Sequence, residues 1–183
     1  YLKKTFKNKE QQYVYSIVLF TLFVENVSLF SQFYIIMHFN RNKSVLKDCA
    51  QQVQYTRNEE MLHAQVGIQI IKTLREEYPE LFDAELEARI REETIDSLAA
   101  EGKVIDWIMD GYSCEGLSAN ILKSFIAKRM KDSLDQIGFD SSAIEYDDHH
   151  INQTYWFDEE LLGANMTDFF QKRPVEYAKG KGI

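Results

Sequence analysis

The chain has 183 residues, of which 45% are hydrophobic and 13% aromatic, and its formal net charge is −8. This length and apolar content exclude a disordered tail and predict one folded core, or one large piece of a larger domain. The negative charge and the lack of a sustained Lys/Arg stripe argue against nucleic acid as a ligand, because nucleic-acid affinity rests on neutralising phosphate charge. Cys49 and Cys114 belong to no CxxC pair, so we expect reduced thiols in a cytoplasmic protein.

Two long helices are predicted in the first half of the chain. Runs of helix-forming residues, few prolines and no alternating strand pattern predict an all-α protein. The first helix is expected over about 9–39 and the second over about 44–77. The polar residues from Asn40 to Lys43 predict the turn between them, and Ser44 is the expected N-cap of the second helix.

Two further helices are predicted before the pattern becomes irregular. The third is expected over about 80–110, directly after a proline, and the fourth over about 118–137, with Gly138 just past its end. Long helices joined by short turns predict an antiparallel bundle, so residues 1–183 are expected to belong to a single domain. An irregular tail with one short helix is expected over residues 139–183.

The first predicted helix is apolar enough to be mistaken for a membrane span. Glu25, Asn26 and Gln32 fall near its centre, where a bilayer tolerates polar groups least. We therefore expect a buried core helix and no membrane partner. Trp107, in the third helix, is likewise expected to pack in the core.

A possible metal site is carried by the first two helices. Glu60 and His63 are three residues apart, so they share a helix face and can ligate one ion through oxygen and nitrogen. Glu25 interrupts the most apolar helix, and a carboxylate taken out of water needs a partner because its desolvation costs several kcal/mol. A carboxylate from one helix and a Glu-x-x-His motif from another make up half of a ferritin-like di-metal site.

The same residues also allow a metal-free interpretation. Glu-x-x-His occurs by chance on charged helices, and Glu25 could pair with a lysine instead. Ala64 and Gly67 follow the motif and would let a neighbouring helix approach closely, although Gly67 could simply be tolerated. His38 is expected to be a polar cap or interface residue, and the adjacent residues 149 and 150, both histidines, are expected in an exposed loop.

Several segments, in this order, resemble the small, radical-generating subunit of class I ribonucleotide reductase. They are V-E-N-V-S-L-F-S-Q-F at residues 24–33, R-N-E-E-M-L-H at 57–63, D-W-I-M-D-G-Y-S-C-E-G-L at 106–117, and N-M-T-D-F-F-Q-K-R-P-V-E-Y at 165–177. The resemblance implies a ferritin-like bundle that binds two iron or manganese ions, as Fe/Fe, Mn/Mn or Mn/Fe. It assigns Glu25, Glu60 and His63 as metal ligands and places Glu59 where the family usually has a second-shell aspartate.

The family's first half has no counterpart in this chain, which begins at Tyr1. The missing part holds an aspartate ligand, a first Glu-x-x-His helix and the tyrosine that bears the radical, so no catalytic radical residue is expected here. We interpret the chain as the C-terminal half of a split, cleaved or truncated small subunit. Its expected partners are a complementary N-terminal half, the large catalytic subunit and a second copy of the assembled small subunit. An unpaired half also predicts exposed apolar surface on the first two helices.

The resemblance implies that the assembled site reacts with oxygen or a reduced oxygen species and passes an oxidising equivalent to the large subunit. The enzyme would then make deoxyribonucleotides, and this half alone would be silent. The separation of Glu25 and Glu60 is one residue longer than in the family, and we expect a π-bulge or the turn to absorb the difference. The alternatives are another ferritin-like oxidase or desaturase completed by a second copy, and a metal-free helical interaction module.

Overall fold

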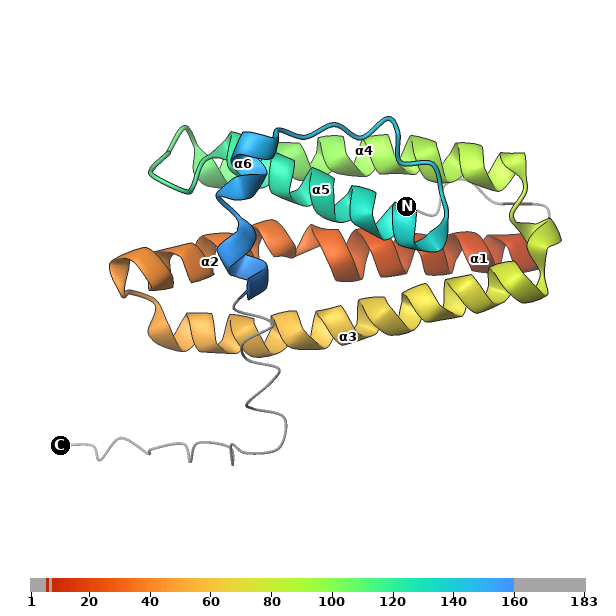
Figure 1. The fold of residues 1–183 in the computed structure, drawn as a ribbon, viewed down its shortest axis with the longest axis horizontal. Helices are drawn as coiled ribbons and strands as arrows, with labels where there is room; N and C mark the ends of the chain where they lie inside the picture. The colour runs from red at the N-terminus through yellow and green to blue at the C-terminus, as the bar shows by residue number, and fades with distance from the viewer. Residues whose placement is uncertain (1–5, 7, 160–183) are drawn as a thin grey trace, which may run out of the picture.

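Residue 6 and residues 8–159 are described by the computed structural model. Three elements follow one another end to end as a single long rod: α1 (Lys9–Leu19), the π-helix η1 (Phe20–Ser28) and α2 (Phe30–Lys43). The helix α3 (Lys47–Glu77) returns antiparallel beside this rod (Figure 1). The chain continues through a 3₁₀ turn, η2 (Pro79–Leu81), into α4 (Ala84–Met109), α5 (Ala119–Ile137) and the short α6 (Asp148–Asn152).

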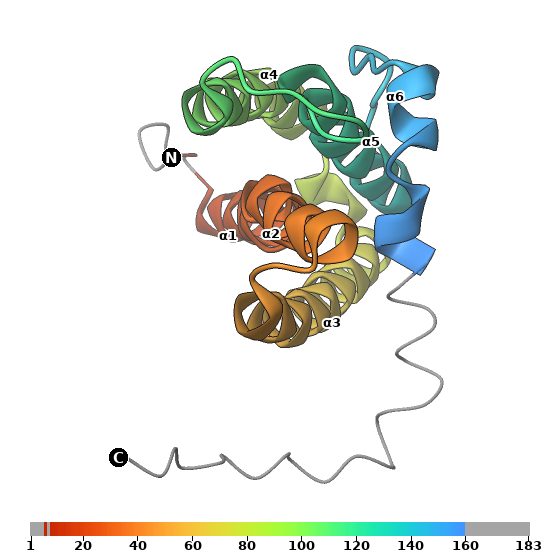
Figure 2. The same cartoon turned by 90° about the vertical axis from the view of Figure 1, so that its left-hand side faces the viewer.

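The rod occupies the middle of the molecule. Viewed from its end, α1 and α2 lie between α3 on one side and the pair α4 and α5 on the other (Figure 2). The described residues contain no strand, only an isolated bridge between Cys114 and Leu117, so the all-α prediction is confirmed. The terminal segment at residues 165–177 lies outside the described residues.

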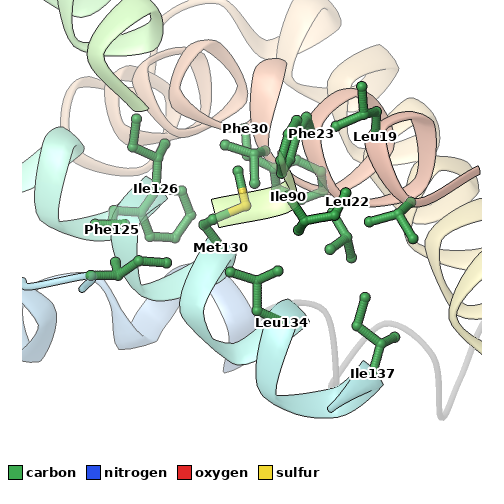
Figure 3. Close-up of a cluster of buried hydrophobic side chains, with 14 of the residues drawn as sticks. Leu19, Leu22, Phe23, Phe30, Ile90, Phe125, Ile126, Met130, Leu134 and Ile137 are labelled. Carbon is green, nitrogen blue, oxygen red and sulfur yellow. The ribbon is translucent and has the colours of Figure 1, made fainter. Parts of the chain in front are cut away.

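The core is built where the rod meets α4 and α5. Leu22 and Phe30 of the rod, Ile90 of α4, and Phe125 and Met130 of α5 are all buried there (Figure 3). Each such side chain contributes about 1.5–3 kcal/mol by leaving water, so this interface holds the rod in place.

The rod is also the one described helical run long and apolar enough to cross a membrane. Of its most apolar window, 61% is buried inside the bundle, as expected for a core helix, and length and composition alone are weak evidence of a span.

The predicted turn between the first two helices was wrong in its position. Residues 40–43 stay helical, and the Asn42 side-chain amide donates to the backbone oxygen of His38 at 3.1 Å. Ser44 is not an N-cap: it adopts a left-handed φ of 54° and ends α2. Because Leu46 is also left-handed, α3 begins only at Lys47, without a side-chain cap. Basic residues in the last turn of α2 favour this extension, since they interact well with the helix dipole.

The later boundaries agree better with the predictions. The helix α4 begins four residues later than predicted, because Pro79 forms the 3₁₀ turn instead and Asp83 caps α4 by accepting from the Leu86 backbone N–H at 2.9 Å. The predicted fourth helix is confirmed as α5, with Ser118 as N-cap and Gly138 at a left-handed φ of 74°. His149 and His150 lie in the short helix α6 rather than in a loop.

The prediction that Trp107 packs in the core was wrong. Its neighbours Ile105 and Met109 occupy the buried face of α4, so Trp107 points to the opposite side and is 80% exposed. We expect Trp107→Ser to change the free energy of unfolding by less than about 0.5 kcal/mol in a chemical denaturation experiment. A loss of several kcal/mol would show that folding buries this side chain after all.

Candidate metal centre

The π-helical turn η1 sets the position of Glu25. A π-helix holds more residues per turn than an α-helix, and such turns appear frequently at functional sites. The Ser28 hydroxyl donates to the backbone oxygen of Phe23, five residues earlier, at 2.7 Å. The expected π-bulge is therefore present, and it lies in the segment that carries Glu25. The Glu25 side chain is only 11% exposed.

The helix α3 brings the other two predicted ligands to Glu25. The Nδ1 atom of His63 lies 3.4 Å from a carboxylate oxygen of Glu25 and 3.4 Å from one of Glu60. One ligand atom from each residue fits within 4.8 Å of the other two. Across the described part of the chain, these residues form the one group of three or more His, Cys, Asp and Glu side chains close enough to share an ion.

A close crossing of η1 and α3 makes this convergence possible. Gly67 of α3 faces Thr21, one turn before Glu25, and a Cβ atom at Gly67 would lie 2.1 Å from the Thr21 hydroxyl oxygen. No side chain fits at that distance. The predicted close approach at Gly67 is therefore confirmed, and the alternative that this glycine is merely tolerated was wrong.

The electrostatics of the three side chains favour a bound cation. Burial raises the pKa of Glu25, and the facing carboxylate of Glu60 raises it further. Hydrogen bonding to Glu60, and then to Glu25, raises the pKa of His63. The raised pKa of His63 means that the two nearby carboxylates favour a positive charge at this position. A divalent cation can supply that charge, and two oxygens with one imidazole nitrogen suit iron or manganese.

Glu59 and the other histidines stand apart from this group. Glu59 is exposed on α3, and within the described residues it makes no hydrogen bond or ion pair with the three ligands. Its second-shell role stays a prediction. His38 is buried between α2 and the loop at Cys114, in agreement with the predicted interface role. His149 is exposed and His150 partly buried, and both lie on α6.

Sequence analysis missed the polar residues that support η1 from behind. Asn26 follows Glu25 directly and is held by Arg129 and Ser133 of α5. Asn26 had appeared only as an argument against a membrane span. The available signal was Arg129 itself, a charged residue beside the apolar residues that predicted the buried face of that helix.

An antiparallel helical bundle that places carboxylates and a histidine together between two helices defines a ferritin-like protein. The chain belongs to the family described as "Ribonucleotide reductase, small chain", whose sequence model matches residues 1–161. This match covers all of the described residues.

Two relatives illustrate the similarity and its extent. The chain is 29% identical over 166 residues to a probable ribonucleoside-diphosphate reductase small subunit of Invertebrate iridescent virus 3, covering 89% of this chain and 42% of the relative. It is 24% identical over 168 residues to the ribonucleoside-diphosphate reductase subunit beta of Chlamydia pneumoniae, covering 91% of this chain and 46% of that protein. The chain therefore spans less than half the length of these relatives.

Proposed function

We propose that this chain is part of the small subunit of class I ribonucleotide reductase, in which Glu25, Glu60 and His63 supply part of a site for two iron or manganese ions. The observation that carries the proposal is the convergence of these three side chains, from η1 and α3, in a member of the small-chain family. The family match favours this function over another ferritin-like oxidase or a metal-free module.

The donor set fits such a metal pair. Glu25 offers a largely buried carboxylate that gains most from a cation, because burial and Glu60 already disfavour its charge. Glu60 is 19% exposed and can bridge toward a second ion, while His63 is 61% exposed at the outer side of the group. When bound, the metal pair would supply the one-electron oxidising chemistry that the large subunit uses on ribonucleotides.

Exposed apolar side chains beside these ligands support a second polypeptide as the missing part of the site. Tyr55, Leu62, Val66 and Ile70 lie on one face of α3 at helical spacing and are exposed, and so are Phe20 and Val24 on η1. The predicted apolar surface of the first two helices is therefore present. We propose that the N-terminal part of the family fold covers this surface and adds the remaining ligands, since this chain spans less than half the length of either relative.

The whole enzyme's activity is tested by reconstitution. The tagged chain is co-expressed with the N-terminal small-subunit polypeptide of the same genome, loaded anaerobically with iron or manganese, and then exposed to oxygen or a reduced oxygen species. It is next mixed with the large subunit and a dithiol reductant, as in the reducing cytoplasm. We expect ribonucleoside diphosphate reduction only when both small-subunit polypeptides are present, in an assembly that holds two copies of each. Full activity of this chain without the second polypeptide would contradict the proposal.

A further inference from the structure

Arg129 and Ser133 of α5 form hydrogen bonds with Asn26, the residue directly after Glu25. The Nε atom of Arg129 donates to the backbone oxygen of Asn26 at 2.9 Å, and its Nη2 atom donates to the Asn26 side-chain oxygen at 2.7 Å. The Asn26 amide donates in turn to the Ser133 hydroxyl, which donates to the Arg129 backbone oxygen at 2.8 Å. One turn of α5 therefore binds both the main chain and the side chain of Asn26.

Arg129 is itself fixed from two sides. Its guanidinium carbon lies 3.6 Å from the centre of the Phe30 ring, and its Nη1 atom lies 3.5 Å from a carboxylate oxygen of Asp158. The side chain is only 12% exposed, and burial lowers the pKa of Arg129 to about 10, so it stays charged at neutral pH. Burying a guanidinium costs several kcal/mol unless its partners are well placed, and an apolar residue would fill this space at lower cost.

The position of these hydrogen bonds explains why a charged residue, Arg129, occupies this buried place. A π-helical turn is less regular than an α-helix, and its return to α-helical hydrogen bonding would shift the register of the segment by one residue. Such a shift rotates a side chain by about 100° and would turn Glu25 away from Glu60 and His63. Two hydrogen bonds to Asn26 from a fixed guanidinium oppose that rotation.

We infer that Arg129 is a positioning residue for the metal ligand Glu25, acting through Asn26, and that Asp158 holds Arg129 in place. The inference rests on the proposed function, since it concerns how the proposed ligand is aimed. It also links the segment that carries Glu25 to the part of the chain around Asp158, which follows α6 and contacts α5 through the Arg129–Asp158 ion pair and the Phe125–Phe157 ring contact.

The test is manganese(II) affinity, measured by titration calorimetry on the protein as purified with its partners. Arg129→Met is expected to weaken manganese binding 10- to 100-fold, the usual loss when a residue that orients a metal ligand is removed. Arg129→Lys keeps the positive charge but lacks the paired N–H donors of the guanidinium group, so it is expected to recover only part of the lost manganese affinity. Lys128→Met is the matched control, because this neighbour on α5 pairs with Asp132 and, within the described residues, makes no bond to η1. The manganese affinity of this variant should stay within twofold of that of the unaltered protein.

A double-mutant cycle separates positioning from general destabilisation. If Arg129 acts through Glu25, then Arg129→Met should lower manganese affinity little further once Glu25→Gln is present. Equal losses in both backgrounds would overturn the inference. If Arg129→Met fails to fold, the milder Asn26→Ala takes its place in the test. This variant should also lower the affinity for manganese. If the unaltered protein binds no manganese, the proposed function itself fails; if it binds and Arg129→Met binds equally well, this inference alone fails.

Discussion

Replacing Glu25 with glutamine is expected to stabilise the metal-free protein and to remove its stabilisation by metal, two effects of opposite sign from one side chain. Without metal, the buried Glu25 carboxylate faces Glu60, and the raised pKa of Glu25 shows that its charge is disfavoured. Neutral glutamine should therefore raise the free energy of unfolding at neutral pH. With metal at about a hundred times its Kd, the unaltered protein should gain about 2.7 kcal/mol, which Glu25→Gln loses in large part.

The pH dependence gives this prediction a second check. A carboxylate whose pKa is higher in the folded state costs stability only when it is ionised. The gain from Glu25→Gln should be absent in acid below the ordinary value of 4.5 and should appear as the pH rises through the raised pKa of Glu25. This stability difference between Glu25→Gln and the unaltered protein is measured by chemical denaturation of the metal-free proteins across this pH range.

The matched variants decide between a metal site and a structural ion pair. Glu60→Ala and His63→Ala should also abolish the response of the melting temperature to added iron or manganese, whereas Glu76→Gln, at an exposed position near the end of α3, should leave it intact. If Glu25→Gln lowers stability equally with and without metal, Glu25 serves a structural pair with His63, and the metal-free module becomes the better account.

Gly67→Ala is expected to have the second large effect, on stability and metal affinity together. The added methyl group would lie 2.1 Å from the Thr21 hydroxyl oxygen and 2.5 Å from its methyl carbon, so η1 and α3 must move apart. Overpacking of this kind costs about 1–3 kcal/mol. Since Glu25 lies one turn beyond Thr21, the same movement separates it from His63, and manganese affinity should fall by about tenfold or more.

Gly102→Ala is the control for this substitution. Gly102 also lies within a long helix, but a Cβ atom there would meet only the end of the Lys123 side chain, at 3.6 Å. Alanine should stabilise α4 by about 0.5–1 kcal/mol and leave metal binding unchanged. Adding Thr21→Ala to Gly67→Ala removes the two nearest atoms and should restore part of the affinity. Unchanged metal binding in Gly67→Ala would show that the close crossing does not position Glu25.

The long helices were predictable because their signals are local. Apolar spacing marks one face of α5, and Ser118 and Gly138 mark its ends through hydrogen bonding and a left-handed turn. The turn after α2 was misplaced because Ser44, a good N-cap by residue type, adopts a left-handed backbone that ends the preceding helix instead. Trp107 was misplaced because residue type predicts burial only on average, whereas the faces of α4 are set by Ile105 and Met109.

The candidate site also has parts that local sequence signals predict and parts that only tertiary structure reveals. Glu60 and His63 lie three residues apart on one helix, so their proximity follows from helical geometry alone. Glu25 could be singled out because it interrupts an apolar helix, whereas the π-helical turn could be inferred only from the spacing in the family. Arg129 escaped prediction because its contact with Asn26 joins residues far apart in sequence, and only tertiary structure brings them together.

Native mass spectrometry of the protein as purified tests the central claim most directly, because one spectrum reports both the partner chains and the metal mass. Membership of the small-chain family, together with three converging candidate ligands beside an exposed apolar surface, predicts a complex. This chain should appear with a second, unequal polypeptide and two iron or manganese ions. Detection of this chain alone and without metal, with no partner or metal bound after manganese is added, would contradict the account.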